Sequence, residues 1–221
     1  MKIIRSWKRR TLALTMAVAA GTMGIGLAAG PASAATCSDV DIVFARGSGE
    51  APGLGITGTP FVNSLRQNLT GKSVSSYAVN YAADVAQTSA GPGATDMTRH
   101  VVSVAASCPN TKFVLGGYSQ GGSVTDISIG IPTLLGSGQT IPTNLAPRVA
   151  AVVVFGNPLA LYGQRITTVS PLYGPKAKEY CNLGDPVCAG GFNIYAHLTY
   201  GFDGSTANGA TFAATRVRAL G

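Results

Sequence analysis

The chain has 221 residues, 46% of them hydrophobic and 11% charged, with a formal net charge of +7. Five of its sixteen Lys and Arg residues lie within the first ten positions. The rest of the chain therefore has eleven basic against nine acidic residues, a net charge of +2. Because no basic patch remains, the composition argues against a nucleic-acid-binding protein. The sequence contains no repeat or low-complexity tract, which favours a globular domain with a sizeable core.

The first 34 residues have the layout of a secretory signal peptide. Basic residues are followed by an apolar run from Leu12 and then by Ala32-Ser33-Ala34, so we expect cleavage after this segment. A membrane anchor is the alternative, although several glycines interrupt the apolar run. Because Arg9-Arg10 also fits a twin-arginine signal, both the Sec route and the twin-arginine route of export remain possible. We expect residues 35–221 to form one exported domain.

All four cysteines lie beyond the expected cleavage site. In an oxidising compartment two disulfides are favoured over a metal site, and three pairings are possible. We favour Cys37 with Cys108 and Cys181 with Cys188, because the second pair closes a short loop and leaves the first to fix the N-terminus. Closing the long loop contributes on the order of 4 kcal/mol by the chain-entropy argument.

Apolar strand-like runs alternate with amphipathic helical segments along the chain. Strands are predicted at 40–45, 74–79, 112–117 and 149–155, and helices at 59–69, 96–107, 121–129 and 211–220. The almost fully apolar strands indicate a mainly parallel sheet covered by helices on both faces. In such a sheet the carboxyl ends of the strands meet at one edge, where ligands bind.

The segment Gly117-Tyr118-Ser119-Gln120-Gly121 lies between a predicted strand and a predicted helix. This is the layout of a sharp turn that lifts a serine hydroxyl out of the sheet, and its glycines give the backbone room to bend. The motif alone is weak evidence in a chain with 29 glycines. In this context, Ser119 is the candidate nucleophile.

A serine hydroxyl needs a base, and the chain offers two histidines. His100 lies in the predicted helix at 96–107, where a residue on the helix surface is the simpler interpretation. Hydrolases with this serine motif order their triad as serine, acid and histidine along the chain. His197, which follows Ser119, is therefore the predicted base.

Four acids follow the candidate serine, and the orienting carboxylate must lie on a loop that reaches the histidine. Asp126 is predicted to face away from the nucleophile, and Asp203 beside Gly204 is a weaker competitor. Asp185 lies in a short loop between Cys181 and Cys188, which a disulfide would hold rigidly. We select Asp185, although Asp-Pro is also ordinary turn chemistry.

Ester hydrolysis also requires donors for an oxyanion. The backbone N–H of Gln120 follows the nucleophile directly, and Ser48, in the loop after the first strand, offers a second donor. Ser48 also fits a simple Gly-Ser-Gly turn. Arg46 and Glu50 flank it and are expected to pair across the loop.

Together these segments closely resemble the cutinase family of secreted serine esterases over the whole mature chain. The matching segments are Arg46-Gly47-Ser48-Gly49-Glu50, the serine turn with its flanking glycines, the Cys181 to Cys188 loop, and His197-Leu198-Thr199-Tyr200-Gly201. The resemblance implies Ser119 as nucleophile, His197 as base, Asp185 as orienting acid, and Ser48 with Gln120 as the oxyanion hole. It also implies the disulfide pairing favoured above.

The resemblance further implies an α/β-hydrolase-like, three-layer α/β/α sandwich, usually with an exposed serine and no large lid. Cofactors and metals are not expected. The expected substrates are esters of hydrophobic acyl chains, in lipids or polyesters, and we expect a monomer in transient contact with lipid interfaces, secreted or held at the cell envelope. The leader and loops look more like the actinobacterial branch than the fungal one. Acetylated polysaccharides, phospholipids and acyl transfer remain alternatives for the same triad.

Overall fold

The computed structural model describes residues 37–221, and the predicted leader lies outside the described residues. The longer elements in chain order are β1 (Val40–Ala45), α1 (Gly55–Asn68), β2 (Val74–Ala78), α2 (Ala90–Ser107), β3 (Lys112–Tyr118), α3 (Gln120–Ser128), β4 (Val149–Phe155), β5 (Ala177–Tyr180), α5 (Ile194–Leu198) and α6 (Ser205–Ala219). Short helices η1 (Thr143–Arg148), η2 (Pro158–Tyr162), α4 (Ile166–Val169) and η3 (Gly174–Lys176) lie in the connections before and after β4.

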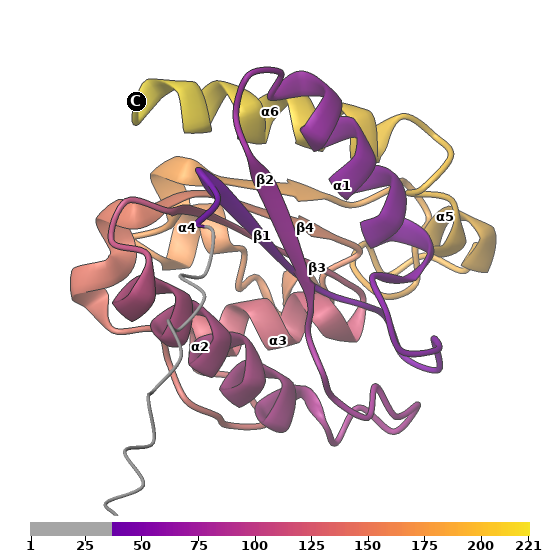
Figure 1. The fold of residues 1–221 in the computed structure, drawn as a ribbon. Coiled ribbons are helices and arrows are strands. Elements are labelled where there is room, and N and C mark those ends of the chain that lie inside the picture. Colours follow the sequence, from indigo (N-terminus) through magenta and orange to yellow (C-terminus); the bar gives the residue numbers. More distant parts are fainter. Residues whose placement is uncertain (1–36) are drawn as a thin grey trace, which may run out of the picture. The chain divides into compact units, whose positions relative to one another are not determined.

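The five strands form one sheet in the order β2-β1-β3-β4-β5, and all neighbouring pairs are parallel. Figure 1 shows α1 and α6 on one side of this sheet and α2 and α3 on the other. The predicted three-layer α/β/α sandwich is confirmed. Because every strand runs the same way, the loops that follow β1, β3 and β4 leave the sheet at the same edge.

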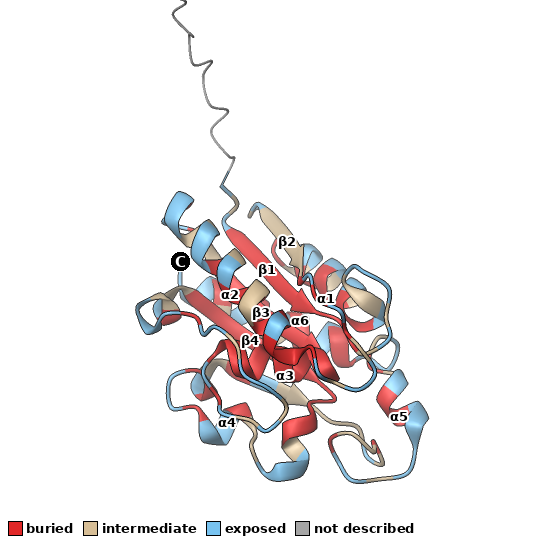
Figure 2. Ribbon diagram, turned by 90° about the horizontal axis from the view of Figure 1, so that it is seen from below, coloured by how far each residue is buried: buried red, intermediate tan, exposed pale blue. Residues whose placement is uncertain are grey.

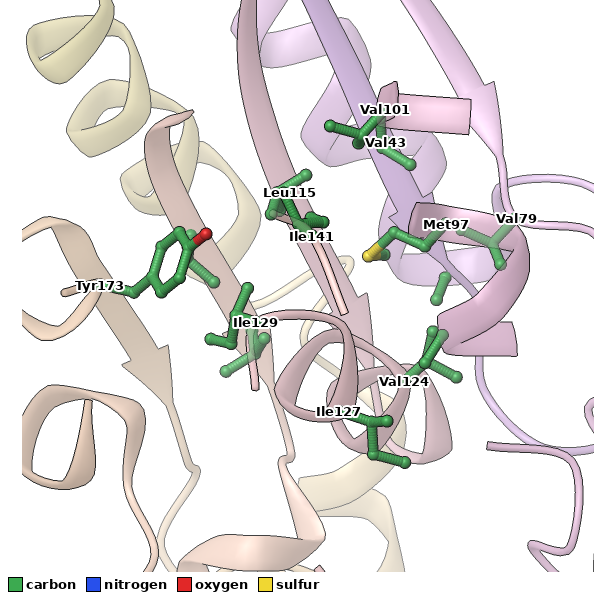
Figure 3. Packing of buried hydrophobic residues seen from close by; sticks show 14 of the residues in the cluster. Val43, Val79, Met97, Val101, Leu115, Val124, Ile127, Ile129, Ile141 and Tyr173 are labelled. Carbon is green, nitrogen blue, oxygen red and sulfur yellow. The ribbon is translucent and has the colours of Figure 1, made fainter. Parts of the chain in front are cut away.

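Two apolar cores lie between the sheet and its helices. One, drawn in Figure 3, packs side chains such as Met97, Leu115 and Val124 between the sheet and the layer of α2 and α3. The other lies under α1 and α6 and contains three phenylalanines in mutual ring contact, Phe44, Phe61 and Phe155. Strands β1 and β4 are buried along their whole length, whereas the edge strand β2 is half-buried (Figure 2). The continuous apolar runs therefore correspond to the central strands, as predicted.

The sequence prediction placed several helix starts too late and missed one strand. Helix α2 begins at Ala90, six residues before the predicted start, because Pro92 lies in the first turn where a missing N–H has no cost. Helix α6 likewise begins at Ser205 rather than at 211. The missed strand is β5, a four-residue edge strand of sequence Ala-Lys-Glu-Tyr, too short and too polar to give a periodic signal.

Both favoured disulfides are present. Cys37 and Cys108 connect the start of the described chain to the end of α2, and Cys181 and Cys188 close a loop after β5. Within residues 37–221, no helix has both the length and the apolar character needed to cross a membrane. The same residues contain no cluster of three or more His, Cys, Asp or Glu side chains able to hold a metal ion.

Candidate active site

Ser119 lies in a strained turn between β3 and α3. Its φ of +55° is unusual for a residue other than glycine, and such strain is characteristic of functional sites. The turn is possible because glycines flank it. A Cβ on Gly117 would come within 1.9 Å of the Gly121 carbonyl oxygen, and one on Gly121 within 2.0 Å of the Ala45 carbonyl oxygen. The predicted elbow is therefore formed at the end of the central strand, with the serine at the start of α3.

His197 lies on the five-residue helix α5 and faces Ser119. Its Nε2 atom is 2.9 Å from the Oγ atom of Ser119. The backbone carbonyl of His197 accepts a hydrogen bond of 2.9 Å from the hydroxyl of Tyr118, the residue that precedes the serine. The elbow itself thus helps to fix the histidine, through a contact that joins residues 79 positions apart in the sequence.

Asp185 completes the arrangement from the loop closed by Cys181 and Cys188. Its Oδ2 atom is 2.8 Å from Nδ1 of His197, and its Oδ1 atom accepts the backbone N–H of Val187 at 2.7 Å. The side chain is fully buried. Burial opposes its ionisation, but the hydrogen bonds from His197, Tyr200 and Val187 outweigh this effect and lower its pKa. A buried carboxylate held in this way favours the histidine tautomer that leaves Nε2 free to accept a proton.

Two further residues support this carboxylate, and the sequence reasoning did not assign them a role. The hydroxyl of Tyr200 donates to Oδ2 of Asp185 at 2.6 Å and accepts the backbone N–H of Asn182 at 2.9 Å. The Asn182 side chain donates to the carbonyl of Ala196 at 2.9 Å, beside His197. Burial and the bond to Asp185 raise the pKa of Tyr200, so its hydroxyl remains a donor. Both residues lie inside the matching motifs, which was the available signal.

The competing residues take other positions. His100 is not a simple surface residue, because its Nε2 atom lies 2.7 Å from Asp41 and its ring stacks on Tyr77. Asp203 accepts the backbone N–H of Ser205 at 2.9 Å, at the start of α6, and makes no bond to His197. Asp126 is fully buried in α3, and its carboxyl oxygens have no hydrogen-bond partner among the described residues. Burial raises the pKa of Asp126 well above its usual value.

The two candidate oxyanion donors lie together. The Ser48 hydroxyl is 3.4 Å from the side-chain oxygen of Gln120, so the loop after β1 meets the start of α3 as expected. Gln120 is the first residue of α3, and the N–H of such a residue has no acceptor within its helix. The positive end of the α3 dipole also points toward this position. The arrangement can therefore stabilise negative charge on a substrate oxygen.

The expected ion pair between Arg46 and Glu50 is absent, which corrects the sequence prediction. Arg46 instead donates from Nε to the backbone carbonyl of Glu50 at 2.8 Å. The Glu50 carboxylate is occupied by two backbone N–H groups, those of Gly47 at 2.5 Å and Ile56 at 2.7 Å. Both side chains therefore act on the main chain of the loop around Ser48.

Access to the candidate serine is narrow. Ser119 is 7% exposed and His197 is 5% exposed, which is less than the resemblance implied. The helix that carries His197 also has three exposed apolar side chains, those of Ile194, Tyr195 and Leu198. Two other apolar residues lie elsewhere: Leu159 is fully buried in the core, and Leu172 lines a separate cavity of about 330 Å³ with Arg216 and Leu220.

These features define the class of the protein. A parallel, helix-covered sheet carries a serine on a strained elbow, a buried histidine adjoins the serine hydroxyl, and a buried aspartate adjoins the other ring nitrogen of that histidine. This is the arrangement of the α/β-hydrolase-like carboxylic ester hydrolases.

Comparisons with known proteins identify the family. The family model described as Cutinase matches residues 36–217. A cutinase of Kineococcus radiotolerans is 60% identical over 190 residues, which are 85% of this chain and 65% of that protein. The phospholipase Culp4 of Mycobacterium tuberculosis is 42% identical over 211 residues, 95% of this chain and 92% of its own. A solved Trichoderma reesei cutinase in complex with a phosphonate inhibitor superposes with a TM-score of 0.65 at 30% identity, over 82% of this chain and 77% of that one. The chain belongs to the cutinase family.

Proposed function

We propose that the protein is a secreted serine esterase that hydrolyses esters of hydrophobic acyl chains. The observation that carries this proposal is the continuous contact from Ser119 Oγ to His197 Nε2 at 2.9 Å and from His197 Nδ1 to Asp185 Oδ2 at 2.8 Å. Three segments that are distant in the sequence supply these groups. A nucleophile, its base and an orienting acid in hydrogen-bond reach are what acyl transfer requires.

The proposed reaction proceeds through an acyl-enzyme. As Ser119 Oγ attacks the ester carbonyl carbon, its proton passes to Nε2 of His197, and Asp185 stabilises the resulting imidazolium. The tetrahedral intermediate then collapses, and the departing alcohol takes the proton from His197. In the second half, His197 removes a proton from water, the hydroxide attacks the acyl carbon, and the acid leaves as Ser119 regains its proton.

The negative oxygen of each tetrahedral intermediate requires fixed donors. We assign this role to the backbone N–H of Gln120 and to Ser48, whose hydroxyl lies 3.4 Å from the side-chain oxygen of Gln120. One such donor lowers the barrier by roughly 3–4 kcal/mol, because it is already oriented before charge develops. The N-terminus of α3 adds to this stabilisation.

Apolar side chains near the site support a hydrophobic substrate held at a lipid or polyester surface. Leu183, within the loop that carries Asp185, and Phe192, just after that loop, are almost fully exposed, and Tyr195 is 73% exposed. Large apolar side chains exposed close together mark interaction surfaces. We therefore propose that the protein acts as a monomer in transient contact with such a surface, after export directed by the leader at residues 1–34. Retention at the cell envelope is a further expectation of this proposal.

The proposal is tested by replacing the nucleophile. S119A should abolish hydrolysis of p-nitrophenyl butyrate and prevent covalent labelling by an alkyl phosphonate, while its circular dichroism spectrum remains that of the wild type. Undiminished turnover by S119A would contradict the assignment. A series of acyl esters from acetate to palmitate then defines the acyl site, and activity rising with chain length supports a hydrophobic substrate.

A phospholipase activity is the second candidate, because one relative of 42% identity is described as a phospholipase. The same triad would then act on a phospholipid acyl ester, since the pocket rather than the fold decides the substrate. Parallel assays on phosphatidylcholine vesicles, tributyrin emulsion and acetylated xylan separate these substrates. Release of fatty acid from the vesicles alone would favour the phospholipase.

A further inference from the structure

Arg46 is a buried cation in the loop between β1 and Ser48. It is 3% exposed, and none of the ion pairs among residues 37–221 involves it. Burying a charge is costly unless its hydrogen bonds are satisfied. The hydrogen-bond acceptors of the guanidinium should therefore indicate why this charge is buried.

The acceptors of the guanidinium are main-chain carbonyls from two loops. Nε donates to Glu50 in its own loop at 2.8 Å, and the terminal nitrogens donate to Tyr81 at 2.7 Å and, through longer contacts, to Val79 and Ala82. The second group of carbonyls lies in the segment that follows β2. Because a guanidinium presents its donors in a rigid plane, it fixes these two backbones relative to each other.

Further contacts join the same two segments. The Tyr81 hydroxyl donates to the carbonyl of Arg46 at 2.5 Å, and its ring lies under the guanidinium, with 5.0 Å between the ring centroid and Cζ. The N–H of Gly49, next to Ser48, donates to the carbonyl of Ala83 at 2.7 Å. Ser48 is thus the centre of a loop that is tied on both sides to the segment after β2.

We propose that Arg46 is a positioning residue that preorganises the oxyanion hole through Ser48, with Tyr81 as its support. This inference rests on the proposed function of Ser48. Oxyanion donors are effective because they need no reorganisation when charge develops, so their supporting loop must be held in place beforehand. Arg46 supplies this support from the buried side of the loop, without touching the substrate.

Arg148 provides a matched control. Its guanidinium also binds main-chain carbonyls, those of Thr111, Ala105 and Cys108 at 2.6–3.0 Å, and lies 5.2 Å from the ring centroid of Phe113. These contacts lie at the amino ends of β3 and β4, the edge of the sheet opposite Ser119. R148K and R46K therefore both remove hydrogen bonds from a guanidinium to main-chain carbonyls. Those of Arg46 hold the loop beside Ser48, whereas those of Arg148 lie at the opposite edge of the sheet.

The test compares R46K, Y81F, S48A and R148K by steady-state hydrolysis of p-nitrophenyl butyrate, at a temperature where each variant is folded by circular dichroism. We expect R46K to lower kcat about 10- to 100-fold, within the effect of losing one oxyanion donor, with KM changed less than about threefold. Y81F should lower kcat less, and R148K should leave it unchanged. The double variant R46K/S48A should be little slower than S48A, because both changes remove the same interaction.

The outcomes separate the inference from the function on which it rests. If S48A is impaired but R46K and Y81F keep wild-type kcat, Arg46 is purely structural and the inference is overturned. Additive losses in R46K/S48A overturn it as well, because Arg46 would then act elsewhere. If S48A keeps full activity, the assignment of Ser48 fails first, and the inference falls with it.

Discussion

The molecule contains two histidine–aspartate pairs at nearly equal distances, one through Nδ1 of His197 and the other through Nε2 of His100. His197 lies 2.8 Å from Asp185, and His100 lies 2.7 Å from Asp41, with both carboxylates buried. The pairs differ in what surrounds the ring. His197 has Ser119 at its second nitrogen, whereas the ring of His100 is stacked on Tyr77 with 3.7 Å between the centroids.

Their places in the sheet explain this difference. Asp41 is the second residue of β1, at the amino end of the strands, whereas the loop carrying Asp185 follows β5 at the carboxyl end. In a parallel sheet only the carboxyl edge collects the loops that can surround a substrate. A buried histidine–aspartate pair is therefore a stabilising contact at one edge and a candidate proton relay at the other.

The largest expected effect separates the two histidines. H197Q should lower kcat about 10⁶-fold, because the serine loses its base. H100Q should leave kcat unchanged and lower the free energy of unfolding by about 1–3 kcal/mol, because buried Asp41 loses a hydrogen-bond partner. Steady-state kinetics and urea unfolding of both variants measure this contrast. Similar kinetic losses in the two variants would contradict it.

The two carboxylates provide the next comparison. D185N should lower kcat by about 10⁴-fold, because an amide at this position favours the wrong histidine tautomer. D41N removes the charge from the other pair, and Ser75 still lies 2.7 Å from the side chain at position 41, so its effect should be confined to stability. The kinetics of both variants with a short acyl ester test this. A D41N variant as slow as D185N would show that the pairs are not distinct.

The tyrosine beside each pair gives a smaller, pH-dependent effect. Asp185 has a lowered pKa, so its ionised form stabilises the folded state, fully so above the ordinary pKa of an aspartate. This stabilisation is lost as the pH falls through the lowered pKa. Y200F removes a hydrogen bond that lowers the pKa. The acid-induced fall in the free energy of unfolding should therefore be complete at a higher pH in Y200F than in the wild type, which urea unfolding over a pH series measures. The kcat at neutral pH should also fall roughly tenfold. Y77F, the control at His100, should leave kcat unchanged.

The disulfides give the smallest expected effect. Opening the Cys181–Cys188 bridge, in C181S/C188S, should lower kcat several-fold before global unfolding, because the loop that carries Asp185 loosens first. Opening the Cys37–Cys108 bridge, which closes a much longer loop, should instead lower the melting temperature with kcat retained below it. Measuring activity and circular dichroism of both variants over the same range of temperatures distinguishes the two effects. Coincident loss of activity and structure in C181S/C188S would refute the role given to its loop.

Much of this molecule was predictable because its signals are local. The apolar runs of β1, β3 and β4 indicated central strands, and the serine between glycines indicated the elbow. The weaker elements carried no such signal. Strand β5 has only four residues, and two adjacent ones are charged, while the start of α2 contains glycine and proline. Propensity therefore argued against both elements, and tertiary packing decided them.

The sequence by itself determined the strand and helix alternation, the elbow at Ser119, and the selection of His197 and Asp185 as the residues to bring together. Only the tertiary structure decided that Asp41 pairs with His100, that Tyr200 bonds to Asp185, and that Arg46 binds main-chain carbonyls instead of the Glu50 carboxylate. The spacing of apolar residues and glycines along the chain indicates local conformation. The partners of a buried polar group depend on which segments the folded core brings within hydrogen-bond distance.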